Sequence, residues 1–257
     1  MSRLLAQSPF RYFKVEGTDR IDWLQGQITQ DMRTIRPGDY ARCALLTPTG
    51  QVVADGAVHI FEDYIMLGLD RLAAEAAFDQ LSRRIVMEDV RMAHHQYPCF
   101  TVVGDPNGGL PSHHVVEANA DFFGEFPELP SMSDVEYQVE RILAGSPLAG
   151  KDYDAKTLAM ELGTHFVETR IAFEKGCYTG QEIVERIRSR GRTHKTLVGL
   201  QSTDEFDMPS DIRITSAAYS DGHGHIALAF APVELAAMGA KVGNAVVTPL
   251  PFPRGRK

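Results

Sequence analysis

The stretch that decides how this chain folds and works is Lys175-Gly176-Cys177-Tyr178-Thr179-Gly180-Gln181-Glu182. It sets one thiol between a cation and an aromatic ring, and an amide and a carboxylate follow. Glycine inside a helix or strand is destabilising relative to alanine, and lysine and glutamate are seldom fully buried. The stretch therefore predicts a loop that presents side chains to a ligand or a partner.

Cys177 is the first candidate for chemistry in this loop. A neighbouring cation such as Lys175 favours the reactive thiolate form of a cysteine, whereas the alternative is a small, buried apolar side chain. Cys43 and Cys99 lie far away in the sequence, and no Cys-x-x-Cys or zinc-finger spacing is present, so we expect no metal site. A Cys–His enzyme stays open, because the histidine of such a pair can be distant in sequence.

Composition sets broad limits on function. The chain has 257 residues, 44% hydrophobic and 23% charged, as in ordinary globular proteins. The net charge of −8 argues against coating nucleic acid through bulk charge, although a local basic patch stays open. The N-terminus lacks the apolar run of a signal peptide, and no stretch approaches the roughly 20 apolar residues of a membrane span. With few cysteines as well, we expect a cytoplasmic protein without membrane contact.

Apolar periodicity predicts an α+β architecture, with helices on one face of a mostly antiparallel sheet. The expected strands are residues 10–15, 43–46, 52–61, 64–69, 86–92 and 100–103, and the expected helices are residues 19–32, 71–84 (capped by Asp70) and 133–143. Residues 105–130 are expected to be mostly loop. Beyond residue 196, short strands at 197–200, 212–218, 225–230 and 245–248 predict a small β unit. We therefore expect domains at residues 1–195 and 196–257.

A basic run follows the thiol motif and consists of Arg186, Arg188, Arg190, Arg192, His194 and Lys195. The alternating arginines would lie on one face of an extended segment. Such a face can bind phosphate or carboxylate groups through forked hydrogen bonds, or it can be a solvated strand edge. In an acidic protein, a small anion or an RNA edge is a better ligand than duplex DNA.

Asp55 lies within an apolar run, where an unpaired carboxylate is costly. It needs a partner, which is either a set of protein donors or a bound ligand. The aromatic residues Phe10 and Tyr137 can stack on a flat ring system, although aromatic side chains at such spacings are usually part of the core.

Residues 175–186 resemble the signature of the YgfZ family of folate-binding proteins, which is related to the glycine-cleavage T-protein, an aminomethyltransferase. The resemblance extends over nearly the whole chain. Supporting stretches are residues 17–19, residues 24–31, Thr49-Gly50 with Asp55, Arg141 with Gly145 and Pro147, and residues 214–217 and 226–229. It implies a T-protein-like fold, with ferredoxin-like modules and a small C-terminal β-barrel around a central pocket. The implied ligand is tetrahydrofolate or a derivative.

The resemblance also implies roles for single residues. Cys177 matches the family's signature cysteine, and Asp55 falls where the T-protein has an acidic residue near the reactive folate nitrogens. Phe10 and Tyr137 fall where a relative has tryptophans beside folate. The expected cofactor-binding set is completed by the residues around the thiol: Lys175, Gly176, Tyr178, Gly180, Gln181, Glu182 and Arg186.

One position departs from the family pattern. Leu143 stands where relatives often carry a glutamate that pairs with the donor edge of the pterin. A leucine side chain accepts no hydrogen bond, so another acceptor is needed, with Glu161 and Glu168 as candidates. Without one, folate binding is weak or altered.

Three functions follow from these observations. The first is a folate-binding accessory protein for iron–sulfur proteins and the tRNA modification that depends on them, with Cys177 as its thiol. That thiol would ligate iron transiently, exchange disulfides, or react with a folate-borne one-carbon unit. The second is a folate-dependent aminomethyltransferase in which Asp55 sets the electrostatics. The third is a tRNA-binding module that uses residues 186–195.

Overall fold

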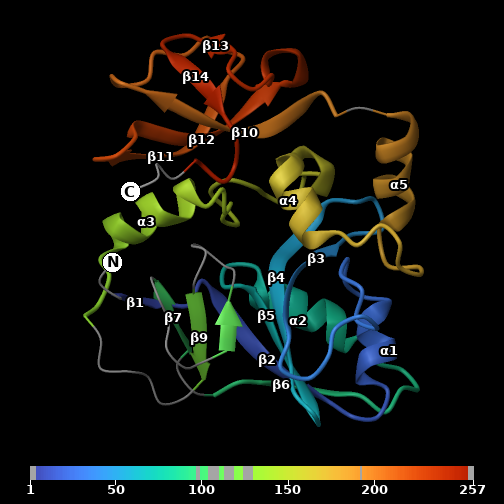
Figure 1. The fold of residues 1–257 in the computed structure, drawn as a ribbon. Helices are drawn as coiled ribbons and strands as arrows, with labels where there is room; N and C mark the ends of the chain where they lie inside the picture. Colours follow the sequence, from blue (N-terminus) through green and yellow to red (C-terminus); the bar gives the residue numbers. More distant parts are fainter. Residues whose placement is uncertain are drawn as a thin grey trace.

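The computed structural model describes residues 4–96, 99–103, 110–112, 119–123, 130–191 and 193–253. Within these residues the chain forms three sheets of antiparallel strands, and helices pack between and around the sheets (Figure 1). The expected α+β class is confirmed. No helix in this part of the chain is both long and apolar enough to cross a membrane.

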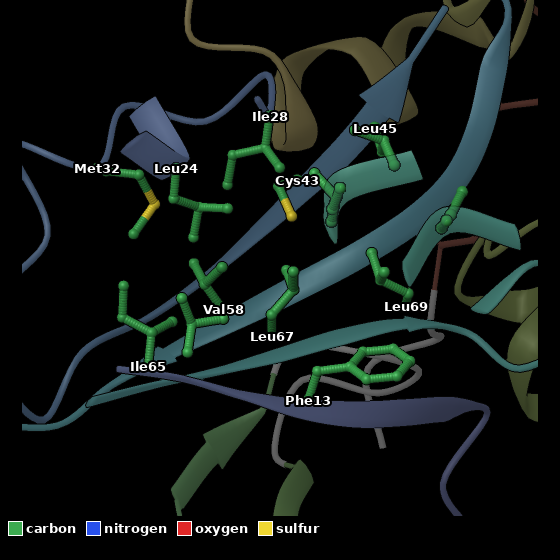
Figure 2. Close-up of a cluster of buried hydrophobic side chains, with 14 of the residues drawn as sticks. Phe13, Leu24, Ile28, Met32, Cys43, Leu45, Val58, Ile65, Leu67 and Leu69 are labelled. Atoms are coloured by element: carbon green, nitrogen blue, oxygen red, sulfur yellow. The ribbon is translucent and has the colours of Figure 1, made fainter. Parts of the chain in front are cut away.

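The first sheet has the strand order β3-β4-β5-β2-β6. Alternate residues of its strands bury one apolar face against the two N-terminal helices, and Figure 2 shows the side chains of this core. The opposite face carries Arg42 on β3 and Asp55 on β4, and Asp55 contacts Arg170 further along the chain. The elements are β2 (Phe10–Glu16), β3 (Tyr40–Leu46), β4 (Val52–Ile60), β5 (Tyr64–Asp70), β6 (Arg91–His94), α1 (Arg20–Gln25) and α2 (Ala74–Ser82).

Helix α1 ends at Gln25, so the expected helix over residues 19–32 is wrong beyond that point. The backbone carbonyls of Gln25, Ile28 and Gln30 accept hydrogen bonds from Lys175 Nζ at 2.7, 2.6 and 2.8 Å. In a continued helix, these carbonyls would instead accept from N–H groups four residues later. The apolar positions Ile28 and Met32 still reach the core, but from a loop.

Two further boundaries differ from the expectation. Asp70 is the last residue of β5 and does not cap α2, which has Ala73 at its N-cap and no side-chain cap. The predicted strand 86–92 is reduced to β6 from Arg91, because the Glu88 carboxylate accepts from the backbone N–H groups of Val86 and Met87 and holds a turn.

The second sheet has the order β1-β7-β9-β8. Two of its strands fall within residues 105–130, so the described part of this segment contains strands where a loop was expected; the rest lies outside the described residues. The strands are β1 (Leu4–Gln7), β7 (Cys99–Val103), β8 (Leu110–Ser112) and β9 (Asn119–Phe123).

Helices α3 and α4 lie between the C-terminal sheet and the other two sheets, while α5 lies at the periphery (Figure 1). Helix α3 begins as expected, with Ser133 and Glu136 forming a reciprocal capping box. At its other end Arg141, fully buried, pairs with Asp152 at 2.7 Å and donates to Ser216 Oγ in the C-terminal sheet. The helices are α3 (Asp134–Leu143), η1 (Ala159–Glu161), α4 (Gly163–Arg170) and α5 (Gln181–Arg190).

The C-terminal sheet has the order β11-β12-β10-β14-β13 and its own apolar core. Among the described residues, β11 and β13 are the edges of this sheet and do not pair with each other. The division of the chain at residues 195 and 196 stays a prediction. The elements are β10 (Lys195–Ser202), β11 (Arg213–Ser220), β12 (Gly224–Pro232), η2 (Val233–Leu235), β13 (Lys241–Val242) and β14 (Ala245–Thr248).

Candidate functional site

The loop before α5 is anchored by a lysine that points inward. Lys175 is 6% exposed, and its ammonium donates to three carbonyls at and after the end of α1 while lying 4.9 Å from the ring centre of Tyr178. An ammonium has three N–H donors, so all of them are used. Burial lowers the pKa of Lys175 to about 8. Lys175 therefore positions the loop and has no donor left for the Cys177 thiolate.

A second set of contacts fixes the same loop to the segment after α1. The Thr179 N–H donates to the Gly26 carbonyl at 3.2 Å. Arg84 Nη1 donates to Thr179 Oγ1 at 2.9 Å and to Gln27 Oε1 at 3.0 Å. Residues 24–31 and 175–182, two stretches that carry the family resemblance, therefore form one packed unit.

The two glycines of the loop have different roles. Gly180 has φ +88°, and a Cβ there would lie 2.6 Å from the Thr47 carbonyl oxygen, so only glycine fits. A Cβ on Gly176 would meet open space. Gln181 begins α5, and its Oε1 accepts from the Tyr178 N–H at 3.3 Å. Tyr178, Gly180 and Gln181 thus shape the turn into the helix, where the exposed Glu182 and Arg186 follow.

Cys177 is exposed at the tip of this anchored loop. Cys43 is buried, and its burial together with Asp55 raises the pKa of its thiol to about 12. Asp55 is also buried, on β4, and no contact between Cys177 and Asp55, the two expected catalytic residues, is present in the described part of the chain. No group of three or more histidine, cysteine, aspartate or glutamate side chains within the described ranges is arranged to hold a metal ion.

Asp55 has the protein partners that its sequence context requires. It is 2% exposed and forms ion pairs with Arg42 of β3 and with Arg170 of α4, the latter at 3.2 Å. The Gly56 N–H donates to Asp55 Oδ1 at 2.9 Å. Both carboxylate oxygens are therefore engaged by protein donors.

Phe10 belongs to the core beside this cluster. Its side chain is 2% exposed, and its ring lies 5.0 Å from the guanidinium carbon of Arg42. Phe166 lies in the same way beside Arg170, at 4.8 Å. Phe10 therefore packs against the Arg42 side chain, and it is not among the residues that line the cavity with Tyr137.

Tyr137 lines a cavity of about 410 Å³ at the start of β2, the end of β5 and the N-terminal half of α3. The wall combines apolar, acidic and basic groups, which suits a flat ligand with polar edges. Its lining residues are Ser8, Pro9, Asp70, Arg71, Leu72, Met132, Asp134, Tyr137, Leu148 and Ala149.

Asp70 is the residue in this cavity that sequence reasoning missed. It is 5% exposed, and burial raises the pKa of its carboxyl. The backbone N–H groups of Leu72 and Ala149 donate to it at 3.1 and 3.0 Å. In the sequence, Asp70 ends an apolar strand and precedes Arg71, and this pattern could have indicated a binding residue. The same pattern also fits a helix cap, which is how the sequence was interpreted.

Glu161 and Glu168, the two acceptors expected in place of Leu143, lie outside the cavity that contains Tyr137. Leu143 is buried in the apolar core around α4. Glu161 accepts from the Leu158 N–H at 3.2 Å and lies 3.9 Å from Lys195 Nζ. Glu168 lines a different cavity of about 250 Å³, between α4 and the C-terminal sheet. Neither glutamate lines the cavity that contains Tyr137.

The basic run after the motif does not form one face. Arg186, Arg188 and Arg190 belong to α5, where residues two apart point in nearly opposite directions, so the extended segment expected there is wrong. Arg188 packs over Phe173 at 4.2 Å. Arg192 lies outside the described residues.

The sequence is similar to those of several known proteins. No family model matches the chain. An uncharacterized protein of Haemophilus influenzae is 25% identical over 243 residues, covering 86% of each chain. The tRNA-modifying protein YgfZ of Serratia proteamaculans is 23% identical, covering 77% of this chain and 70% of its own. A mitochondrial iron-sulfur cluster assembly factor IBA57 homolog of Mycosarcoma maydis is 22% identical, over 76% of this chain and 56% of its own.

The fold matches a solved structure over almost the entire chain. The glycine cleavage system aminomethyltransferase T of Bartonella henselae superposes with a TM-score of 0.78 at 16% identity, covering 98% of this chain and 86% of that one. The chain therefore has the T-protein fold. The sequence relatives of the chain include a YgfZ protein and an IBA57 homolog, and the expected resemblance to the YgfZ family and to the T-protein is confirmed.

Proposed function

We propose that this protein is a folate-binding accessory factor that supports iron–sulfur cluster proteins and, through them, tRNA modification. The observation that carries the proposal is the similarity over three quarters of the chain to relatives named for these two processes. The T-protein fold, with an aromatic-lined cavity inside it, supports the folate part.

We assign the folate ring to the cavity lined by Tyr137. The tyrosine ring offers a flat stacking surface. Among the described residues, Asp70 Oδ2 already accepts from the Ala149 N–H and the Tyr153 hydroxyl, whereas Oδ1 accepts only from the Leu72 N–H. Asp70 Oδ1 therefore has a lone pair for one N–H donor of a pterin edge, which is the role that Leu143 cannot fill. Arg71, also in the wall, can attract the carboxylates of the folate tail. In this proposal Asp70 replaces Glu161 and Glu168 as the acceptor.

Cys177 acts in this proposal as an exposed thiol that meets a partner protein. Lys175, Tyr178, Gly180 and Gln181 hold its loop in one conformation. A lone thiolate binds cluster iron only together with further ligands, because clusters are held by several cysteines. The missing ligands would come from the client protein.

Replacement of Cys177 by alanine tests this role. In a strain that lacks the gene, we expect the Cys177→Ala variant to fail to restore the activity of iron–sulfur enzymes. Gly176→Ala is the matched control, because its added methyl group meets open space in the same loop, and it should restore activity. Full rescue by Cys177→Ala would contradict a functional thiol.

The second candidate is a folate-dependent aminomethyl transferase, which the T-protein fold favours. Asp55 would be its electrostatic residue, yet both of its oxygens are occupied by Arg42, Arg170 and the Gly56 N–H. A carboxylate held in this way has little hydrogen-bonding capacity left for a folate nitrogen. The candidate predicts turnover of a methylamine-type donor with tetrahydrofolate, lost in Asp55→Asn. Absence of turnover across a panel of donors would eliminate it.

A further inference from the structure

The exposed face of helix α5 carries a stripe of charged side chains that begins beside the thiol loop. Glu182, Arg186 and Arg190 are exposed and follow each other at four-residue steps, so they lie along one side of the helix. Helix α5 itself lies at the periphery of the molecule (Figure 1). Because an α-helix rises about 1.5 Å per residue, the two arginines lie roughly 8 and 14 Å along the axis from Gln181, the first residue of α5. The stripe is therefore acidic near Cys177 and basic further away.

The two arginines of this stripe, the Arg186–Arg190 pair, have no carboxylate partner among the described residues. Neither guanidinium takes part in an ion pair, a hydrogen bond or a ring contact in this part of the chain. Arg188, which lies between them in sequence, is already engaged, because it packs over Phe173 at 4.2 Å and lies 3.5 Å from Glu185. Like charges four residues apart in a helix repel each other, and the helix dipole offsets this only for Arg190, in the last turn. The pair is therefore a local excess of positive charge on a chain of net charge −8.

The order of charges along the stripe favours an acidic protein over a nucleic acid as its partner. Glu182 is the member of the stripe nearest to Cys177 in sequence, and Glu174 is exposed on the other side of the thiol loop. A phosphate backbone that reached the thiol along α5 would meet these carboxylates, and the net charge of −8 would repel it further. A folded protein can instead place carboxylates against the arginines alone, where forked hydrogen bonds form, and neutral or basic groups against the glutamates.

We propose that the exposed face of α5 is a docking surface for the iron–sulfur client protein, which presents an acidic patch to Arg186 and Arg190. This inference rests on the proposed function, in which the Cys177 thiol meets the same client. The acidic patch would lie roughly 10 Å along α5 from the group of the client that meets the thiol loop. Charges at the rim of an interface act mainly on the rate of association, so the arginines speed the encounter of the thiol with its partner.

The test uses defined peptides, each with a single cysteine held as a mixed disulfide with thionitrobenzoate. Several aspartates follow the cysteine after about four residues, a spacing that spans roughly 13 Å in an extended chain, and a matched peptide carries asparagines there. The Cys177 thiolate attacks the peptide sulfur and forms a protein–peptide disulfide, while thionitrobenzoate leaves with the electron pair of the old S–S bond. Its absorbance gives the rate, and Cys177→Ala gives the background rate of the other cysteines.

In the wild type, we expect the aspartate peptide to react about threefold to tenfold faster than the asparagine peptide at low salt. The net charge of −8 would by itself slow the acidic peptide, so a faster reaction reports the local arginines. The advantage should disappear as the ionic strength rises, because exposed charges are screened.

Substitutions assign this preference to α5. Arg186→Glu together with Arg190→Glu should abolish or reverse it. Arg186→Gln together with Arg190→Gln should reduce it, and this pair keeps the test valid if the double reversal fails to fold. The matched control is Arg36→Glu together with Lys241→Glu, two exposed positions outside α5 with the same change of net charge. The control should react as the wild type does.

Equal rates of the two peptides at low salt, or a preference that the α5 variants retain, would overturn the docking surface. A tRNA that blocks the reaction of the wild type, but not that of the Arg186→Glu, Arg190→Glu variant, would assign the face to RNA and also overturn the proposal.

Rescue of iron–sulfur enzyme activity in the strain that lacks the gene separates this surface from the proposed function. We expect the Arg186→Glu, Arg190→Glu variant to restore several-fold less activity than the Arg36→Glu, Lys241→Glu control. Poor rescue by the α5 variant with full rescue by Cys177→Ala would keep the surface and remove the thiol. Full rescue by the α5 variant with failure of Cys177→Ala would remove the surface and keep the thiol.

Discussion

The ammonium of Lys175 binds three carbonyls that lie between 145 and 150 residues earlier in the chain. From the sequence, this lysine was expected to act on the neighbouring Cys177. Because its donors point inward, its role is to hold residues 24–31 and the thiol loop together. The sequence therefore indicated that the loop around Cys177 matters, but it did not predict that the Lys175 ammonium points away from the thiol and into the molecule.

At the same scale, His165 makes the stability of the protein depend on pH. Its folded-state pKa is about 4, below the ordinary value of 6.5, so between these values the unfolded chain binds the proton and the folded chain does not. The free energy of unfolding should therefore fall as the pH decreases from 6.5 to 4. After allowance for solvent screening, we expect a loss of about 2 kcal/mol.

Urea denaturation of the wild type and of His165→Gln across this pH range measures the contribution. The variant should lose less stability on acidification, while His194→Gln, at an exposed position, should follow the wild type. Parallel curves for the wild type and His165→Gln would show that His165 takes up its proton normally in the folded state.

At the scale of elements, the turn into α5 depends on Gly180. Alanine there requires a left-handed backbone and brings its Cβ within 2.6 Å of the Thr47 carbonyl oxygen. We expect Gly180→Ala to lower the free energy of unfolding by about 2 kcal/mol or more. Gly176→Ala should be close to neutral or slightly stabilising. If the two substitutions lowered the free energy of unfolding equally in urea denaturation, the turn into α5 would not depend specifically on a glycine at position 180.

Strands and helices differ in how well the sequence predicted them. Strands β2, β3, β4 and β5 follow from apolar runs whose partners are near in sequence, and α3 follows from its start at Ser133 and its end before Gly145. Helix α1 was predicted too long because a lysine far along the chain takes its carbonyls. Helix α5 was missed because arginines at every second position also suit an extended segment.

For the whole molecule, the resemblance predicted the fold, which the T-protein match confirms over 98% of the chain. The sequence could not predict how the candidate residues are grouped. Cys177 lies on an exposed loop, Asp55 in a buried ion-pair cluster, and Tyr137 in a separate cavity with Asp70. These groupings depend on which faces of the sheet and helices meet, and residue spacing does not encode that.

This arrangement separates two tasks. In the proposed function, the cavity lined by Tyr137 takes the folate ring, and the surface loop presents the Cys177 thiol to a partner. The central claim is therefore that the chain binds folate in the Tyr137 cavity, without direct participation of Cys177.

Anaerobic titration calorimetry with tetrahydrofolate tests this claim most directly. We expect saturable heat with one site per chain, and affinity about tenfold weaker in Tyr137→Ala and in Asp70→Asn, through loss of stacking or of a charge-assisted hydrogen bond. Cys177→Ala and the exposed-site control Tyr219→Ala should bind as the wild type does. No heat of binding in the wild type, or full affinity in both cavity variants, would contradict the account.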